Sequence, residues 1–385
     1  MFGQLQTTLN FYFYGKSRFT KTGYLKNVKQ YKDRNFLEEV DLTGRVYMIT
    51  GANSGIGKEM ALYVAKKGAT VFMVCRSPER AVVARDDIVE KSKNENVIFL
   101  QADVGLEKDV RRVMQEFSDH PLSCSNSKDG KTPQLNSLVC NAGALLHKRQ
   151  LTSEGFETTF ASHLLFGTYL LGDLALPILK NTGDSRMVMV SSGGMYNYAL
   201  PSWETLSGTH DDSIKDYDGQ KAYAYAKRGQ VLLAERWSKE NPVPIVTAHP
   251  GWTLSEGVEA AFGESKNWLK PLRSCWEGAE GICWLMTTPA KDIQGGEFYL
   301  DRSPQPKHIA GCFFYEGTAT KNTIEDIDLF HANMFRWGAA DAKLAKTDLW
   351  RSTPERTEVK FQARSTHKEA PPTNVVFDLE GFIKK

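Results

Sequence analysis

The chain has 385 residues, of which 41% are hydrophobic, so it can bury the core of one large domain and still form extensions. It carries 48 Lys and Arg residues against 46 Asp and Glu residues, and a formal net charge of +2 gives no reason to expect a nucleic-acid partner. No uninterrupted apolar run approaches the ~20 residues of a membrane span, so no transmembrane segment is expected.

The cysteines indicate the compartment. The 6 cysteines include no C-x-x-C pair and have no histidine neighbour at metal-ligand spacing, so no metal site is expected. Cys75 and Cys140 end apolar runs that are typical of strands. Buried thiols of this kind favour a reducing, intracellular compartment over a disulfide framework.

Residues 1–43 form an aromatic and basic N-terminal arm, in which no acidic residue precedes Asp33. This start is compatible with a mitochondrial address, although it is poor in arginine and interrupted by glycine. Contact with a membrane surface, binding to a protein partner and packing against the chain's own domain are the other interpretations. We therefore expect a mitochondrial or cytoplasmic location and leave the role of the arm open.

From Arg45 onward, short apolar runs alternate with amphipathic helical stretches. Residues 71–75 and 187–190 are apolar throughout, which is typical of parallel strands buried on both faces. The pattern predicts an α/β domain over residues 44–310, with a Rossmann-type doubly wound parallel sheet. A polar stretch, residues 119–134, is expected to form a surface loop. The strands are expected at residues 46–50, 71–75, 97–101, 136–140, 186–191, 243–248 and 297–300.

The last segment, residues 311–385, does not belong to this sheet. A capped amphipathic helix is predicted from residue 322 to about residue 337. The side that docks on the domain would present Ile324, Ile327, Phe330 and Met334. Beyond residue 340 the chain is polar and is expected to lack order by itself, which makes it a candidate binding segment for another protein.

The first predicted strand breaks into a glycine-rich turn, Thr50-Gly51-Ala52-Asn53-Ser54-Gly55-Ile56-Gly57, which leads into a helix. A strand, a tight turn and a helix start offer free backbone N–H groups and the positive end of a helix dipole to a phosphate. The spacing is G-x-x-x-G-x-G and differs from the G-x-G-x-x-G of the common dinucleotide fingerprint. A plain tight turn without a ligand is the alternative.

Other strand ends add candidate cofactor contacts. The end of the second strand normally meets the adenosine ribose, where an acidic residue suits a free 2′-hydroxyl and a basic one suits a 2′-phosphate. Arg76 takes this place, so a phosphate partner is expected, with an ordinary exposed arginine as the alternative. Asp103 would accept a hydrogen bond from the adenine amino group. Asn141-Ala142-Gly143, after the fourth strand, supplies small residues for close approach of a cofactor.

A tyrosine and a lysine carry the candidate chemistry. Tyr223 and Lys227 lie four residues apart, on one face of a predicted helix. A phenol has a pKa of about 10, so proton exchange near neutral pH requires a nearby positive charge, which Lys227 would supply. Ser192, after the fifth strand, would hold the substrate oxygen. In isolation, a purely structural role of the Tyr223 pair is the alternative.

A second pair with the same spacing, Tyr217 and Lys221, lies just upstream. Asp218-Gly219 interrupts this pair, whereas Tyr223 and Lys227 enter a sustained helical stretch. Because the two members of the upstream pair would not share a helix face, we exclude it.

The order and spacing of the motifs resemble the short-chain dehydrogenase/reductase superfamily. The motifs are Thr50-Gly51-x-x-x-Gly55-Ile56-Gly57, Asp103-Val104, Asn141-Ala142-Gly143, Ser191-Ser192, Tyr223-x-x-x-Lys227 and His249-Pro250-Gly251-Trp252. Thr22-Gly23-Tyr24, Val190-Ser191-Ser192-Gly193-Gly194-Met195, Glu235-Arg236-Trp237 and Phe298-x-x-Asp301-Arg302-x-Pro304 are similar to a branch called dehydrogenase/reductase SDR family member twelve.

The resemblance implies an oxidoreductase that prefers NADP(H), with NAD(H) as the second candidate, and that acts on a small carbonyl or alcohol substrate. Tyr223 would be the general acid/base, Lys227 would hold the nicotinamide ribose and Ser192 would orient the substrate. The cofactor would be bound by Gly51, Asn53, Ser54, Gly55, Ile56, Gly57, Arg76, Asp103, Val104, Asn141, Ala142, Gly143, Tyr223, Lys227, Pro250, Gly251 and Ser255. An apolar substrate is expected, because Met195, Tyr196, Tyr198, Trp203 and Trp252 would flank the site.

One position departs from the family pattern. The family has an asparagine in a Phe-x-x-Asn-x-x-Gly context, where it supports a water chain to the lysine. Here His163 takes the asparagine position between Phe160 and Gly167, and one extra residue precedes the glycine. A neutral imidazole is able to relay a proton, but the histidine is equally compatible with a site no longer in use. The second hypothesis is therefore an accessory subunit of a larger, mitochondrial assembly, with partners at residues 1–40 and 340–385.

Overall fold

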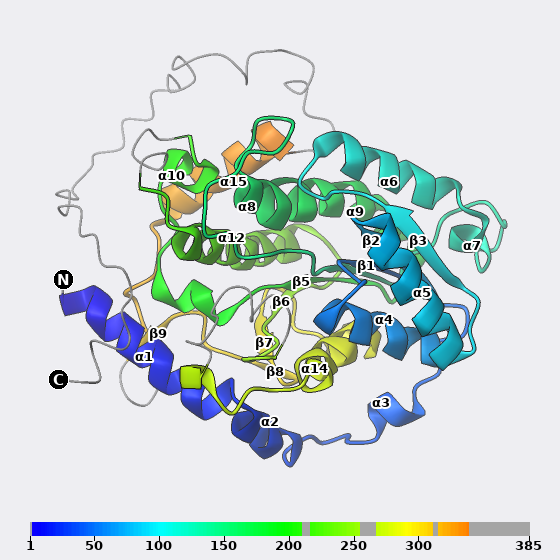
Figure 1. The fold of residues 1–385 in the computed structure, drawn as a ribbon, viewed down its shortest axis with the longest axis horizontal. Coiled ribbons are helices and arrows are strands. Elements are labelled where there is room, and N and C mark those ends of the chain that lie inside the picture. Colours follow the sequence, from blue (N-terminus) through cyan, green and yellow to red (C-terminus); the bar gives the residue numbers. More distant parts are fainter. Residues whose placement is uncertain (1, 210–215, 255–266, 311–314, 339–385) are drawn as a thin grey trace. The chain divides into compact units, whose positions relative to one another are not determined.

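The centre of the protein is an eight-stranded sheet with the strand order β3-β2-β1-β4-β5-β6-β7-β8 (Figure 1). The structure, a computed structural model, describes residues 2–209, 216–254, 267–310 and 315–338. Strands β1 to β7 run parallel, and β8 pairs antiparallel with β7. The predicted doubly wound sheet is confirmed, with β1 (Val46–Thr50), β2 (Thr70–Cys75), β3 (Val97–Gln101), β4 (Ser137–Cys140), β5 (Arg186–Val190), β6 (Ile245–Ala248) and β7 (Phe298–Leu300).

The patterns did not predict three two-residue strands after β7. These are β8 (Ser303–Pro304), β9 (Ile309–Ala310) and β10 (Tyr315–Glu316), of which the last two form a separate antiparallel pair. A strand of this length has too few residues to show an alternating pattern.

Helices cover both faces of the sheet (Figure 1). On one face α4 (Gly55–Lys66) contacts both α5 (Pro78–Ser92) and α14 (Cys275–Thr287). The opposite face carries α6 (Glu107–Asp119), α8 (Thr158–Phe160), the π-helix η1 (Ala161–Leu170), α9 (Leu171–Thr182), α12 (Gly219–Glu240) and α15 (Ile324–Gly338). Further helices in the described part of the chain include α1 (Phe2–Arg18), α2 (Lys21–Val28), α3 (Phe36–Glu39), α7 (Pro121–Cys124), η2 (Gly193–Asn197), α10 (Trp203–Ser207) and η4 (Ala290–Asp292).

The strand register brings the candidate motifs to one edge of the sheet. Thr50 at the end of β1 pairs with Val74 of β2, and Ile49 pairs with Val139 of β4. The glycine turn and the segments after β2 and β4 therefore emerge side by side. The strand order also reverses direction between β1 and β4, and such a switch point is where open α/β sheets bind ligands.

The expectation for residues 119–134 was wrong in part. The segment contains the short helix α7, in which Ser123 and Cys124 are buried. His120 begins this helix, because its Nδ1 accepts a hydrogen bond from the Leu122 amide at 3.1 Å. The polar composition gave no sign of this turn.

The N-terminal arm packs against its own domain. Tyr14 and Phe19 are buried in one cluster with Met195, Tyr196 and Trp252. The Phe19 carbonyl also accepts a hydrogen bond from the Trp252 amide at 2.8 Å. Among the interpretations of the arm, packing on the domain therefore holds for this stretch.

Buried charges fasten the arm to the domain. Arg273 and Asp301 form an ion pair whose side chains are 1% and 2% exposed. The same guanidinium donates from Nε to the Phe19 carbonyl at 2.9 Å and from Nη2 to the Arg18 carbonyl at 2.8 Å. Asn27 of α2 donates to the Asp301 carboxylate at 2.9 Å. One buried pair thus holds two segments that are far apart in the sequence.

Helix α15 follows the predicted boundaries and docks on η1. Phe330 and Met334 are buried, as expected, but Ile324 is 75% exposed and does not belong to the docking face. Residues 340–385, which carried the expectation of a partner-binding tail, lie outside the described residues.

One helical segment, Thr158–Thr182, is long and apolar enough to cross a membrane by length and composition alone. It comprises α8, η1 and α9, and 72% of its most apolar window is buried inside the protein. Core helices of globular proteins meet the same criterion, so the segment is weak evidence for a membrane span.

Candidate active site

The glycine turn after β1 has the geometry of an anion cradle. Gly51 and Gly55 adopt left-handed φ angles of 66° and 54°, which glycine tolerates best. The hydrogen-bond ladder of α4 starts with the Lys58 amide on the Ser54 carbonyl at 3.2 Å, so the amides of the first helical turn lack helical acceptors. A Cβ on Gly57 would lie 2.2 Å from the Gly51 carbonyl oxygen, so only glycine allows this close packing.

Asn141 braces the turn from the neighbouring strand. Its Nδ2 donates to the Thr50 carbonyl at 2.9 Å. The Thr50 hydroxyl in turn accepts from the amides of Asn141 at 2.9 Å and Ala142 at 2.8 Å. The structure therefore ties this asparagine to β1, and its role at the nicotinamide stays a prediction.

Arg76 and Asp103 meet at the adenosine end of the expected site. The Arg76 side chain is 77% exposed, and its guanidinium lies 3.6 Å from the Asp103 carboxylate. The other carboxylate oxygen of Asp103 accepts from the Gly105 amide at 2.9 Å, and Val104 is buried. The two candidate residues thus come together from the ends of β2 and β3.

Helix α12 carries the tyrosine and the lysine. It begins at Gly219, and the Asp218 carboxylate caps it by accepting from the amides of Gln220 at 2.9 Å and Lys221 at 3.1 Å. Tyr217 precedes the helix, so the upstream pair does not share a helix face. The structural reason for excluding this pair therefore holds.

Lys227 is buried, at 3% exposure, behind the ring of Tyr223. Its Nζ donates to the Val190 carbonyl at 2.7 Å and lies 5.4 Å from the centre of the Tyr223 ring. Burial lowers the pKa of Lys227 to about 7. Near neutral pH, this amine is therefore poised between its charged and neutral forms.

Burial and Ser192 act on the phenol of Tyr223, and the expected effect of Lys227 on it stays a prediction. Burial raises the pKa of Tyr223, and a hydrogen bond with the Ser192 side chain lowers it. The hydroxyl of Ser192 also accepts from the Gly194 amide at 3.2 Å, which fixes it at the start of η2. Ser192 is thus one partner that favours the phenolate.

His163 lies edge-on against Tyr223, with 5.2 Å between the ring centres. The extra residue between Phe160 and Gly167 is accommodated by the π-helix η1, which has a wider turn than an α-helix. Gly143 makes room for the imidazole, since a Cβ there would lie 2.1 Å from His163 Cε1. The small residue that was expected to admit a cofactor therefore admits His163.

We expect Gly143→Ala to displace the imidazole and to lower the free energy of unfolding by about 1–3 kcal/mol, as overpacking does. Urea unfolding of the variant would measure the loss. Gly194→Ala is the matched control, because the nearest atom to a Cβ there is Ser192 Oγ at 3.7 Å. The double variant Gly143→Ala/His163→Asn should recover stability, and a loss as large as in the single variant would contradict the clash.

Arg228 is a site residue that the sequence did not reveal. It is fully buried on α12, and its guanidinium donates to the carbonyls of Met195 at 2.6 Å, Tyr198 at 3.3 Å and Lys307 at 3.0 Å. It therefore ties the helix that carries Tyr223 to the loop after Ser192. An arginine in a helix normally predicts a solvated position, so the sequence contained no signal for this role.

Most of the residues that were expected to flank the substrate pack against other parts of the protein. Met195, Tyr196 and Trp252 are buried against the N-terminal arm. Trp203 packs edge-on against Trp337, with 5.1 Å between the ring centres. Tyr198, whose ring meets Tyr225 at 5.4 Å, lies on the loop after Ser192 with intermediate exposure.

The turn after β6 holds the remaining candidates. Gly251 has a φ of 74°, and a Cβ on it would lie 2.2 Å from Arg273 Nε, so this glycine gives room to the buried ion pair. Pro250 precedes it, and its carbonyl accepts from the Thr253 hydroxyl at 2.9 Å. Ser255 lies outside the described residues.

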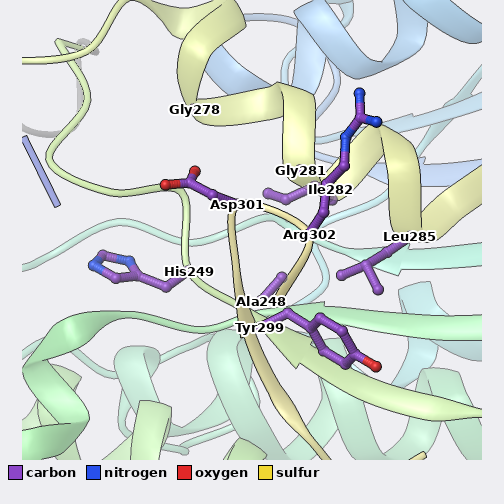
Figure 2. Close-up of a pocket in the computed structure, with 9 residues that line it drawn as sticks. All are labelled: Ala248, His249, Gly278, Gly281, Ile282, Leu285, Tyr299, Asp301 and Arg302. Atoms are coloured by element: carbon purple, nitrogen blue, oxygen red, sulfur yellow. The ribbon is translucent and has the colours of Figure 1, made fainter. Parts of the chain in front are cut away.

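Two hollows lie outside the predicted catalytic residues, and the first of them adjoins His249 and Asp301. The first, between β6, β7 and α14, includes Ala248, Ile282 and Tyr299 in its lining, and no water-sized sphere fits into it (Figure 2). The second has a volume of about 170 Å³ and lies between α10 and α15, beside Leu206 and Phe330. In the part of the chain that the structure describes, no cluster of His, Cys, Asp or Glu has the arrangement of a metal site.

A glycine cradle at the switch point of a parallel sheet, with a tyrosine and a lysine at the same edge, defines an oxidoreductase that works with a nicotinamide dinucleotide. The family described as short chain dehydrogenase matches residues 45–203. Dehydrogenase/reductase SDR family member 12 of Bos taurus is 36% identical over 77% of this chain and 88% of its own length. Retinol dehydrogenase 12 of Homo sapiens is 33% identical over 68% of this chain and 79% of its own length. The chain belongs to the short-chain dehydrogenase/reductase family.

Solved structures show the same fold. A short-chain type dehydrogenase/reductase from Mycobacterium marinum superimposes with a TM-score of 0.52 at 19% identity, over 69% of this chain and 95% of the other. A short-chain dehydrogenase from Escherichia coli CFT073, complexed with NADPH, gives a TM-score of 0.51 at 20% identity, over 67% and 96%.

Proposed function

We propose that the protein is an NADP(H)-dependent oxidoreductase that moves hydride between the nicotinamide and a carbonyl or alcohol carbon of a small apolar substrate. The observation that carries this proposal is the placement of Tyr223 and Lys227 on one helix beside Ser192, at the sheet edge that also bears the glycine turn. Proton transfer and cofactor binding are thereby brought to a single location.

The glycine turn and Arg76 fit the dinucleotide. The amides of Gly55, Ile56 and Gly57 open α4 and would bind the pyrophosphate. Arg76 is exposed at the end of β2 and suits a 2′-phosphate. NAD(H) is the second candidate, because the guanidinium already has a partner in Asp103.

The roles of the side chains follow from their positions. A bound nicotinamide dinucleotide supplies or accepts the hydride. In reduction, the Tyr223 hydroxyl donates its proton to the oxygen of the former carbonyl, and in oxidation the phenolate takes that proton back. Ser192 Oγ holds the same oxygen. Lys227, whose pKa burial lowers to about 7, would bind the ribose and, as the ammonium, balance the charge on the Tyr223 phenolate.

The substrate class rests on relatives. Proteins named retinol dehydrogenase 11 and 12 are among those similar to this chain, and retinol is an apolar alcohol. The ring of Tyr198, on the loop after Ser192, meets the ring of Tyr225 on α12, and this aromatic pair would suit such a molecule. We therefore propose an apolar alcohol or its carbonyl counterpart.

The cofactor assignment predicts the effect of Arg76→Ala. We expect the affinity for NADPH to fall about ten-fold or more, because a charge-assisted contact with the 2′-phosphate is lost, while the affinity for NADH stays within about two-fold. Thermal-shift titrations with both cofactors measure this difference. Arg85→Ala is the matched control, since Arg85 lies on α5 with a side chain that is 37% exposed and pairs with Asp86. Equal losses for both cofactors would contradict the assignment.

The same titration, combined with a turnover assay, distinguishes the enzyme from the accessory subunit, the two hypotheses that the sequence left open. Binding of NADPH together with turnover of an apolar aldehyde or ketone supports the enzyme. Binding without turnover of a panel of such substrates favours an accessory subunit, in which the nucleotide has a structural role.

A further inference from the structure

The His163 main-chain carbonyl is fully occupied by side chains. It accepts a hydrogen bond from Thr168 Oγ1 at 2.7 Å and another from Gln230 Nε2 at 2.8 Å. The same Gln230 amide also donates to Thr168 Oγ1 at 3.1 Å. A carbonyl oxygen has two lone pairs, so no water molecule can use this one. The water chain that the family builds from this position therefore has no place on this carbonyl.

The imidazole, in contrast, has one ring nitrogen without a partner. His163 is 1% exposed, and its Nε2 lies 3.0 Å from the Ala144 carbonyl. A carbonyl only accepts, so Nε2 carries the hydrogen and Nδ1 has a free lone pair. Nδ1 is buried without a hydrogen-bond partner in the structure. A buried acceptor of this kind is costly unless a donor fills it.

Lys227 is a candidate donor beside the same tyrosine, although this contact is not formed in the structure. Its ammonium has three N–H bonds, of which one is used by the Val190 carbonyl. Both Lys227 and His163 lie against the ring of Tyr223, at 5.4 Å and 5.2 Å from its centre. Burial, and next to it the charge of Lys227, lowers the pKa of His163 to about 3, so the imidazole is neutral across the physiological range. With Nε2–H committed to a carbonyl, His163 has no second base to which it could relay a proton.

We propose that His163 is a positioning residue whose Nδ1 accepts a hydrogen bond from the Lys227 ammonium, and that Gln230 and Thr168 fix it through its main-chain carbonyl. The inference rests on the proposed function only for its effect on turnover. Gln230 lies one helical turn after Lys227 on α12. The same helix therefore positions the lysine directly and His163 through Gln230. The imidazole thereby replaces the water chain as the hydrogen-bond acceptor that positions the lysine.

The first test needs no turnover. In the full-length protein labelled with ¹⁵N-histidine, we expect a neutral Nε2–H tautomer of His163 from pH 5 to pH 9, assigned by its loss in His163→Asn. In Lys227→Met, the ¹⁵N chemical shift of Nδ1 should move to the value typical of an imidazole nitrogen that accepts no hydrogen bond. An Nδ1–H tautomer, or an Nδ1 signal that is the same in Lys227→Met, would overturn the proposal. This result stands even if no substrate is turned over.

The second test follows the pH profile of kcat. The described titratable groups around Lys227 are Cys140 of β4, Tyr223 of α12 and His163 of η1. A hydrogen-bond acceptor stabilises the Lys227 ammonium and raises its pKa. Gln230→Met should misplace the His163 imidazole, lower the pKa of Lys227 and so move the basic limb of the profile about one pH unit downward, with unchanged NADPH affinity.

Thr168→Val should act in the same direction as Gln230→Met. The matched control is Thr287→Val, because Thr287 is also buried and donates to a carbonyl in its own helix, that of Cys283 at 2.8 Å, but lies on α14. Its profile should match that of the unmodified protein. An unshifted basic limb in Gln230→Met, with the fold intact by circular dichroism, would overturn the role of Gln230.

Discussion

Tyr223→Phe is expected to lower kcat by about 10³-fold, within the range that a positioned general acid/base contributes. The variant loses only the hydroxyl, whose proton must move to or from the substrate oxygen. The ring, and with it the edge contact to His163 at 5.2 Å, is kept. The affinity for NADPH should therefore change by less than about two-fold, because the glycine turn and Arg76 are untouched. Single-turnover and thermal-shift measurements on the same preparation separate the two effects.

Tyr217→Phe is the matched control for this loss. Tyr217 has the same spacing to a lysine, but its hydroxyl donates to the Glu157 carboxylate at 3.1 Å and lies before α12. Its removal should cost about 1 kcal/mol of stability and leave kcat unchanged. Turnover of Tyr223→Phe at the rate of the unmodified protein would overturn the acid/base assignment. A similar fall in both variants would point to a general disturbance of the helix.

The sheet could be predicted because its signals are local. Residues 71–75 and 187–190 are apolar throughout and became buried parallel strands. Asp218 and Gly219 mark a helix start, and this signal distinguished Tyr223 from Tyr217. Each of these signals lies within a few residues of the feature that it predicts.

The supports of the site could not be predicted because they join distant segments. Arg228 is a buried donor to three carbonyls, although its residue type predicts exposure. Trp252 is an aromatic residue of the kind that lines apolar substrate pockets, but it packs on the N-terminal arm. The extra residue before Gly167 could be seen in the sequence, whereas the π-helix that accommodates it depends on tertiary contacts. Such features require the positions of elements that the sequence alone does not place.

Asp301→Asn is expected to lower the free energy of unfolding by about 3–5 kcal/mol, the cost of leaving one partner of a buried ion pair uncompensated. Asn keeps the shape of the side chain and tolerates the left-handed backbone, which has a φ of 51° here. The charge that balances Arg273 is lost, and Arg273 also holds the carbonyls of Arg18 and Phe19. The arm should therefore loosen before the sheet unfolds. Urea unfolding, together with limited proteolysis of residues 1–43, measures both effects.

The surface pair of Arg236 and Asp328 is the control, because its side chains are 45% and 58% exposed. Asp328→Asn should cost less than about 1 kcal/mol. The double variant Arg273→Met/Asp301→Asn should recover part of the loss, because it removes the unpaired charge, but not the hydrogen bonds to the arm. If Asp301→Asn cost no more than Asp328→Asn, the buried pair would not hold the arm. Since that arm packs on Met195 and Tyr196, just after Ser192, a loosened arm should also raise KM for the substrate while NADPH affinity is retained.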